Sequence, residues 1–186
     1  MKRVPLSSIQ PSISTEAERF FDRYAYPDWL RAHSRLVGRI AETLVAARDD
    51  MGGDSRDIAL AGYLHDIGRS PLVASDAREH NELSALILAA EGLAGAVEPA
   101  RRHAIYTVLD PATAPLSLAD KIVYVADRRG GMSVETVEVR ARDTARRHPR
   151  YATDIERAIP IAKDLEREVF AGLPFAPDEL ERHLLG

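Results

Sequence analysis

The chain has 186 residues, of which 45% are apolar and 29% are charged, proportions typical of a globular protein with one substantial core. A formal net charge of −4 argues against a protein that binds nucleic acid through a broad basic surface. Cysteine is absent, which excludes disulfides and thiolate ligands, so any bound metal needs imidazole and carboxylate ligands.

The first residues carry no pattern of a targeting segment. Residues 1–14 lack the continuous apolar run of a signal peptide, and no later stretch is suited to a membrane span. We therefore expect a cytoplasmic protein without a membrane partner, and an extended arm over residues 1–14. A capping box of Thr15 and Glu18 then predicts a short helix that runs to about Tyr24.

A longer amphipathic helix follows this short one. Pro27 suits its first turn, where proline is tolerated because the backbone N–H has no helical partner. The apolar side of this helix carries His33. The pair Gly52-Gly53 is expected to end it.

The next helix ends at an unusual pair of side chains. Asp54 or Ser55 is expected to cap its beginning, and an apolar run then leads to His65 and Asp66. Glycine and proline break the helix after this pair. A loop of moderate length is expected over residues 68–78, and loops beside metal sites often carry substrate contacts.

Helical patterns recur along the rest of the chain, and the signal for β-strands is weak throughout. We expect further helices over Glu79 to Ala90, Leu93 to Val108, Ser117 to Arg129, Val134 to Arg147, Tyr151 to Phe170, and from Pro177 or Asp178 onward. No repeat or inter-domain linker is visible, so we predict one all-α domain over residues 15–186. Its core covers about residues 28–131, and additional helices follow over residues 132–186.

The adjacent residues His65 and Asp66 suggest a metal centre. Neighbouring residues on a helix point about 100° apart, so both cannot face the core, but at a helix end both can reach one cavity. A lone histidine on an apolar face is more often a hydrogen-bonded core residue, whereas four histidines that precede Asp127 in or beside apolar patterns favour ligands. The candidate ligands are His33, His65, Asp66, His80, His103 and Asp127.

This ligand set is chemically suited to hard or borderline cations. Neutral imidazole and carboxylate bind iron, manganese and similar ions at about 2.0–2.2 Å. The two oxygens of Asp66 could bridge two ions about 3.5–4 Å apart, and a hydroxide shared by such a pair is placed for in-line attack on phosphorus. We therefore expect divalent transition metals, two per chain, with iron, manganese, cobalt and zinc all compatible with these ligands.

Other polar residues are weaker candidates. Asp120 and Asp127 lie two helical turns apart, so the spacing allows either to be the last ligand. His148 and His183 lie in charged C-terminal segments, and we expect them to be solvated side chains.

The order of His33, His65-Asp66 and Asp127 over helical segments resembles the HD superfamily of metal-dependent phosphohydrolases. Within it, the chain is most similar to the bacterial YqeK-type enzymes, which split diadenosine tetraphosphate symmetrically at a dinuclear, often iron, centre. The matching stretches are GYLHDIGR at 62–69, HNELSA at 80–85, RRHAIY at 101–106, KIVYVAD at 121–127 and GLPFAP at 172–177.

The resemblance implies an HD-domain helical bundle that hydrolyses a phosphoanhydride or phosphoester of a nucleotide, a dinucleoside polyphosphate among the candidates, by attack of a metal-bound hydroxide. The partner is then a small-molecule nucleotide, not a nucleic acid, and a homodimer is left open. The resemblance favours Asp127 over Asp120 as the last ligand, with Asp120 as a cap or as a carboxylate that orients a ligand imidazole.

Arg69 lies where HD relatives often place a basic residue against substrate phosphate, a role suited to planar guanidinium donors. The resemblance therefore makes Asp66 and Arg69 the candidate catalytic residues, and Arg69 the candidate substrate-binding residue. Weaker candidates for phosphate binding are expected to be surface charges, namely Lys121, Arg128 and Arg129. Tyr63 and Tyr106 are expected to be core aromatic residues.

Two alternatives to this function stay open. After His103 the chain reads AIYT at 104–107, where the YqeK-type enzymes have a stretch that contains threonine and glycine. This difference supports a nucleotide-sensing or scaffold HD module with little activity as one alternative. The other is a mononuclear deoxynucleotide phosphatase in which His80 and His103 serve the substrate.

Overall fold

The computed structural model describes residues 12–49, 51 and 55–184. Within these ranges the chain is built from α-helices and short 3₁₀ turns, and the only β-type pairing is an isolated bridge between Gly130 and Val134. The predicted all-α fold is confirmed. None of the helices in this part of the chain is long and apolar enough to cross a membrane.

The helices occupy most of the described residues. In chain order they are α1 (Ile13–Arg23), α2 (Asp28–Ala46), α3 (Ser55–Leu64), α4 (His80–Ala90), α5 (Ala94–Arg101), α6 (Leu118–Arg129), α7 (Val137–Arg147), α8 (Ala152–Phe170) and α9 (Leu180–His183). The 3₁₀ turns are η2 (Ile67–Arg69), η3 (Pro71–Val73), η4 (Ile105–Leu109), η5 (Pro149–Tyr151) and η6 (Pro177–Glu179).

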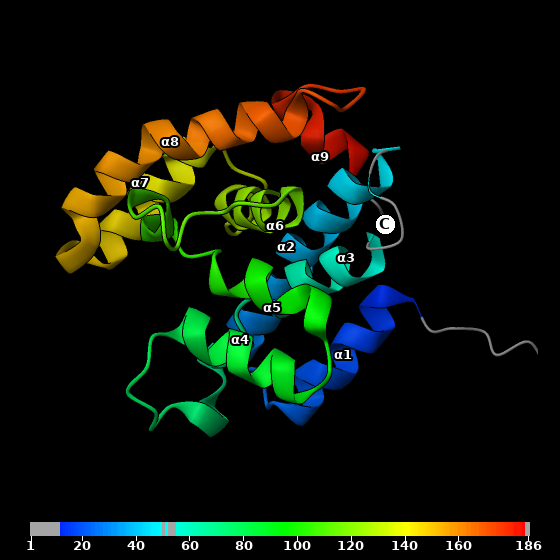
Figure 1. Cartoon of the computed structure of the whole chain (residues 1–186), viewed down its shortest axis with the longest axis vertical. Helices are drawn as coiled ribbons and strands as arrows, with labels where there is room; N and C mark the ends of the chain where they lie inside the picture. The colour runs from blue at the N-terminus through cyan, green and yellow to red at the C-terminus, as the bar shows by residue number, and fades with distance from the viewer. Residues whose placement is uncertain (1–11, 50, 52–54, 185–186) are drawn as a thin grey trace, which may run out of the picture.

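Three helices, α2, α3 and α6, form the centre of the molecule (Figure 1). The helices α1, α4 and α5 lie on one side of them, and the pair α7 and α8 lies on the other. Fully buried side chains on the central helices include Leu30, Ile40, Leu64 and Ile122. The core therefore lies along the helices that carry most of the predicted ligands.

The start of α1 differs from the prediction. The N-cap is Ser12, whose hydroxyl accepts a hydrogen bond from the Thr15 backbone N–H at 3.2 Å. The predicted capping box at Thr15 is therefore wrong, and Glu18 instead accepts hydrogen bonds from Arg35 at 2.6 and 2.9 Å. The last part of the predicted arm, residues 12–14, belongs to this cap and helix, and residues 1–11 lie outside the described residues.

The helix α2 begins only after Pro27, and it ends earlier than predicted from the sequence. Pro27 is the residue that precedes the helix and does not lie in its first turn, and α2 stops at Ala46. Two aspartates follow soon after, and carboxylates are unfavourable near the negative end of a helix dipole. The expected end at Gly52-Gly53 and the cap Asp54 lie outside the described residues, and Ser55 is the first residue of α3.

The single helix predicted over Leu93 to Val108 is two elements, α5 and η4. The break lies at His103, whose Nδ1–H donates a hydrogen bond to the Ala100 carbonyl at 2.6 Å. In a continuous helix that carbonyl would accept the N–H of Ala104. The imidazole thus takes the place of a backbone donor, and the helix cannot continue.

Smaller differences occur at other helix starts. Glu79, Ser117 and Tyr151 precede α4, α6 and α8 rather than begin them. The helix α7 begins at Val137, not at Val134, because Thr136 caps it with a hydrogen bond of 3.2 Å from the Val139 N–H.

The helices α2 and α3 approach closely where Gly38 lies under the ring of Tyr63. A Cβ atom built on Gly38 would lie 2.2 Å from ring carbons of Tyr63. Tyr63 is 2% exposed, as expected of a core aromatic, and its hydroxyl donates to Glu42 Oε2 at 3.0 Å. This close contact sets the distance between the helices that carry His33 and His65.

We predict that Gly38→Ala lowers the free energy of unfolding by about 1–3 kcal/mol, because the added methyl group must displace the Tyr63 ring or separate the helices. Thermal unfolding followed by circular dichroism measures this. Ala32→Ser, at an exposed position of the same helix, is the control and is expected to stay within about 0.5 kcal/mol of the wild type. Equal melting temperatures for Gly38→Ala and the control would contradict the close contact.

Candidate metal centre

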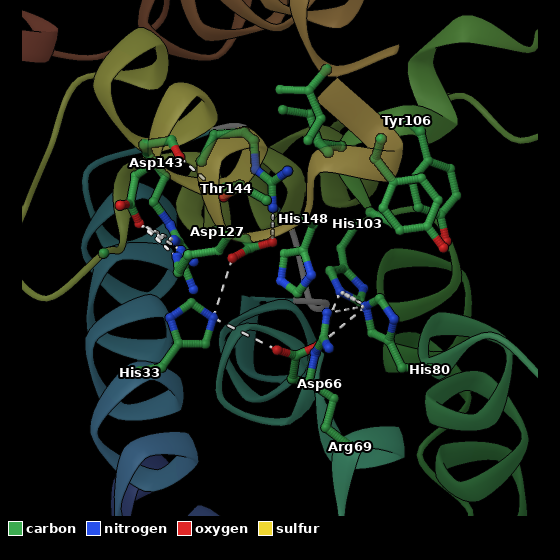
Figure 2. A pocket seen from close by; sticks show the side chains of 18 of the residues that line it. His33, Asp66, Arg69, His80, His103, Tyr106, Asp127, Asp143, Thr144 and His148 are labelled. Carbon is green, nitrogen blue, oxygen red and sulfur yellow. Dashed lines mark hydrogen bonds and ion pairs between the residues drawn. The ribbon is translucent and has the colours of Figure 1, made fainter. Parts of the chain in front are cut away.

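The structure brings all six predicted ligands together (Figure 2). They come from five helices that meet at one end of the central layer. The ligand His33 lies in the second turn of α2, His65 and Asp66 follow α3, His80 begins α4, His103 follows α5 and Asp127 lies in α6.

Two of the histidines are held by the same local device. The Nδ1–H of His65 donates to the Gly62 carbonyl at 2.8 Å, just as His103 bonds to Ala100. Each bond fixes the ring and directs its Nε2 toward the centre of the cluster. There His65 Nε2 lies 3.2 Å from His33 Nε2, and His103 Nε2 lies 3.2 Å from His80 Nε2.

The two carboxylate oxygens of Asp66 face different pairs of histidines. Its Oδ2 lies 3.7 Å from Nε2 of both His33 and His65. Its Oδ1 lies 3.4 Å from His80 Nε2 and 3.3 Å from His103 Nε2. Asp66 therefore stands between two groups of imidazoles.

Asp127 belongs to the first of these groups. Its Oδ1 lies 3.2 Å from His33 Nε2 and 3.8 Å from His65 Nε2. Ligand atoms bound to one ion at about 2.1 Å with tetrahedral or octahedral angles lie about 3.0–3.4 Å apart. The separations in the cluster are close to this range, and the donor set of imidazole and carboxylate could hold a divalent transition metal.

Four of the candidate ligands, His65, Asp66, His80 and Asp127, have the protonation states that metal binding requires. Burial is the main reason why the pKa of His65 is lowered to about 4 and that of His80 to about 3, so both imidazoles are neutral at neutral pH. Burial opposes ionisation of Asp66 and Asp127, but the neighbouring guanidinium and imidazole groups outweigh it and hold both pKa values well below their usual range. Neutral imidazole and ionised carboxylate are the metal-binding forms.

Two arginines contact the carboxylates of the cluster. The Nε–H of Arg69 donates to Asp66 Oδ1 at 2.8 Å, and its Nη2 donates to His80 Nε2 at 3.0 Å. Arg128 donates to Asp127 Oδ2 and lies over the Tyr124 ring, 5.4 Å from its centroid. Each carboxylate therefore faces a cation on one side and imidazoles on the other.

The predicted surface positions of Arg128 and Arg129 are wrong. Their exposed fractions are 6% and 5%, because both lie at the end of α6 beneath the C-terminal helices. Arg129 donates to Glu166 Oε1 at 2.6 Å and to the Pro177 carbonyl at 2.8 Å, which joins α6 to α8 and η6. Lys121 is partly exposed and pairs with Glu168 at 2.5 Å.

Asp120 lies outside the cluster and caps α6. Its Oδ2 accepts hydrogen bonds from the backbone N–H groups of Leu116 and Ser117 at 3.1 and 3.0 Å. The Ser117 hydroxyl in return accepts the Asp120 N–H at 3.1 Å, which completes a capping box. The two carboxylates on α6 thus have different positions, one at the helix start and one in the cluster.

The family model described as HD domain matches residues 30–132, which is more than half of the chain and includes all six cluster residues. The chain belongs to the HD domain family. No curated protein and no solved structure matched the chain significantly. HD domains are generally hydrolases that bind divalent metals, and the His/Asp cluster of this HD domain is where a metal could be held.

A cavity of about 680 Å³ opens beside the cluster. One wall is formed by the HD cluster, and α7 with the following turn lies across from it (Figure 2). Cavity residues that sequence reasoning missed are Trp29, Met132, Arg140, Arg147 and Arg150. Two signals could have found some of them: Trp29 lies four residues before His33, and Arg140 lies seven residues before Arg147, so each pair shares a helix face.

The structure also tests the expectations for two histidines and one tyrosine, His148, His183 and Tyr106. His148 is exposed, as expected, but it also lines the cavity of the HD domain. Tyr106 is not a core residue, because it is partly exposed, lines the cavity and stacks on Tyr151 with ring centroids 5.8 Å apart. His183 is exposed and stacks on Phe175 at 4.2 Å.

We predict that Asp66→Asn loses most of the metal bound by this HD domain, because one neutral amide oxygen replaces two anionic oxygens. Asp120→Ala is the matched control. It is expected to lower the free energy of unfolding by about 1 kcal/mol, through loss of the helix cap, and to keep its metal. Elemental analysis after expression in manganese- or iron-supplemented medium, together with thermal unfolding, separates the two roles, and equal metal content in Asp66→Asn and the wild type would contradict the ligand role.

Proposed function

We propose that the protein is a metal-dependent phosphohydrolase that cleaves a phosphoanhydride or phosphoester of a nucleotide. The observation that carries this proposal is the position of Asp66, whose two oxygens face separate pairs of histidines beside a cavity. Membership of the HD domain family supports the same reaction class.

The residues of the cluster divide naturally between two cations. Asp66 Oδ2 with His33, His65 and Asp127 would hold one ion, and Asp66 Oδ1 with His80 and His103 would hold the other. Iron and manganese suit these ligands. When bound, such ions lower the pKa of a coordinated water molecule and offset negative charge on a phosphoryl group.

The residues of the chain bury most of the cluster and hold its ligands in a fixed orientation. His65, Asp66 and His103 are 0%, 4% and 1% exposed, so their interactions are little screened by solvent. The carbonyls of Gly62 and Ala100 hold two of the imidazoles by their Nδ1–H groups. The ligand atoms therefore need little rearrangement when a cation and a substrate enter.

Arg69 is suited to bind the phosphoryl group that reacts. One edge of its guanidinium bonds Asp66 and His80, and its side chain is 38% exposed toward the cavity. The remaining N–H donors can meet phosphate oxygens and balance the charge that develops on them.

We propose a dinucleoside polyphosphate as the substrate, with symmetrical cleavage of diadenosine tetraphosphate as the specific reaction. The resemblance of the sequence to YqeK-type enzymes is one support. The cavity volume of about 680 Å³ is another, because small-molecule sites commonly enclose 300–1,000 Å³. The substrate would be a free small molecule.

Hydrolysis by the purified protein tests this proposal. The panel contains diadenosine tetraphosphate, nucleoside mono-, di- and triphosphates, deoxynucleotides and bis-p-nitrophenyl phosphate, each with added Mn²⁺ or Fe²⁺. We expect ADP as the single nucleotide product from diadenosine tetraphosphate, and loss of the reaction after chelation or in Asp66→Asn. Absence of turnover on every member of the panel, with metal bound, would reject the enzyme. A change in fluorescence of Trp29, the single tryptophan, on adding nucleotide would then support the sensing module.

We predict that Arg69→Ala lowers kcat/KM for the best substrate by about 10- to 100-fold, because charge-assisted hydrogen bonds contribute about 1.5–3 kcal/mol. Arg69→Lys should recover part of the loss. Arg78→Ala is the control, since Arg78 is exposed in the same loop, pairs with Asp76 at 2.5 Å and lies outside the cavity lining. An unchanged kcat/KM in Arg69→Ala would remove Arg69 from the site.

One observation favours the mononuclear phosphatase as a second candidate. Arg69 already bonds both Asp66 Oδ1 and His80 Nε2, which are two of the three ligand atoms of the second group. With one ion in the first group, His80 and His103 would be left to serve the substrate. One metal equivalent per chain, unaffected by His80→Ala, would support this candidate, whereas two equivalents would support the dinuclear centre.

A further inference from the structure

The wall of the cavity opposite the metal centre lies outside the part of the chain that matches the HD family. It comes from α7 and η5, whereas the family match ends at residue 132. On this wall Arg140, Arg147 and Arg150 lie with one carboxylate, Asp143, which pairs with Arg147 at 2.7 Å. The far wall is therefore cationic.

Arg140 on α7 has unmet donor capacity. Its side chain is only 13% exposed, and its pairing with Asp143 is long, at 3.8 Å. Its Nε is buried and has no hydrogen-bond partner among the described residues. The guanidinium lines the cavity and has no close acidic partner there, so a ligand whose oxygens meet its Nη groups would be bound favourably.

Arg128 repeats this feature on the neighbouring helix. Its side chain is 8% exposed, and one edge of the guanidinium bonds Asp127. Its Nε is also buried without a partner. Arg128 and Arg140 thus both line the cavity with a guanidinium group whose Nε is buried and unpaired among the described residues.

The electrostatics of the wall agree with this geometry. Burial, together with the neighbouring cations Arg128 and Arg147, lowers the pKa of Arg140 despite the opposing field of Asp127. Burial, Arg147 and Arg69 likewise lower the pKa of His148 at the cavity mouth. Charged groups on the cluster side, Arg69, Arg128 and Asp127, therefore act on residues of the opposite wall across the cavity.

We propose that Arg128 and Arg140, with Arg147 at the mouth, form a second anion site that holds a phosphate group which is not cleaved. A substrate would then reach from the metal centre, where its scissile phosphorus lies, to α7. The site selects substrates whose phosphate chain extends beyond the scissile bond. Its role in substrate choice rests on the proposed function, whereas anion binding itself does not.

Calorimetric titration of the metal-free protein with inorganic tripolyphosphate tests binding without catalysis. We expect one site in the wild type, and weakening by about 10-fold or more in Arg140→Ala through loss of charge-assisted hydrogen bonds. Arg142→Ala is the matched control on the same helix, because Arg142 pairs with Glu138 at 2.8 Å and lies outside the cavity lining. It should stay within about twofold of the wild type.

Arg140→Lys and thermal unfolding distinguish the loss of an anion site from a loss of folding in Arg140→Ala. The lysine keeps one positive charge but loses the planar fork, so a well-folded Arg140→Lys with intermediate affinity supports the site. Wild-type affinity in both Arg140→Ala and Arg147→Ala would overturn the proposal. No measurable binding of tripolyphosphate by the folded wild type would overturn it as well.

Kinetics then test the selection of substrates. In Arg140→Ala we expect kcat/KM for diadenosine tetraphosphate to fall by about 10-fold or more, while that for bis-p-nitrophenyl phosphate, which has a single phosphate, stays within about twofold. Equal losses on both substrates would assign Arg140 to the metal centre and overturn the second site. If the wild type hydrolyses neither, the proposed function fails, and the calorimetric result still decides whether the anion site exists.

Discussion

The structure depends on keeping two buried carboxylates, Asp66 and Asp127, ionised in the interior. Isolated buried charges are strongly unfavourable, so each carboxylate must be compensated by cations and hydrogen-bond donors. Arg69 and Arg128 provide one side of this compensation, and the imidazoles of the cluster surround the other. Five helix segments converge on the two carboxylates and supply the groups that compensate their charge.

The same device directs two of the imidazoles. At His65 and at His103 the ring replaces a backbone N–H as the partner of a helical carbonyl, so the helix stops and the ligand is oriented in one step. At these two positions a single histidine therefore determines both where the helix ends and how the imidazole is oriented. A substitution there would alter both the end of the helix and the cluster.

Much of the fold could be predicted from the sequence, because apolar periodicity marks the helices and the histidines lie in or beside those patterns. The GYLHDIGR stretch identified the helix end that carries two of the cluster residues. The break at His103 was missed, because it arises from a side-chain hydrogen bond that periodicity does not report. The burial of Arg128 and Arg129 was also missed, since α6 is covered by helices distant in sequence.

The boundary of the cavity has a consequence for how such a protein can diversify. The residues of the His/Asp cluster lie on one set of helices, and much of the opposite wall lies on a later pair joined to them through Arg129. Mutations on that pair can reshape the volume in front of the cluster and leave its ligands untouched. A lineage can thereby alter the shape and charge of the cavity without rebuilding the cluster, so the two parts are able to evolve at different speeds.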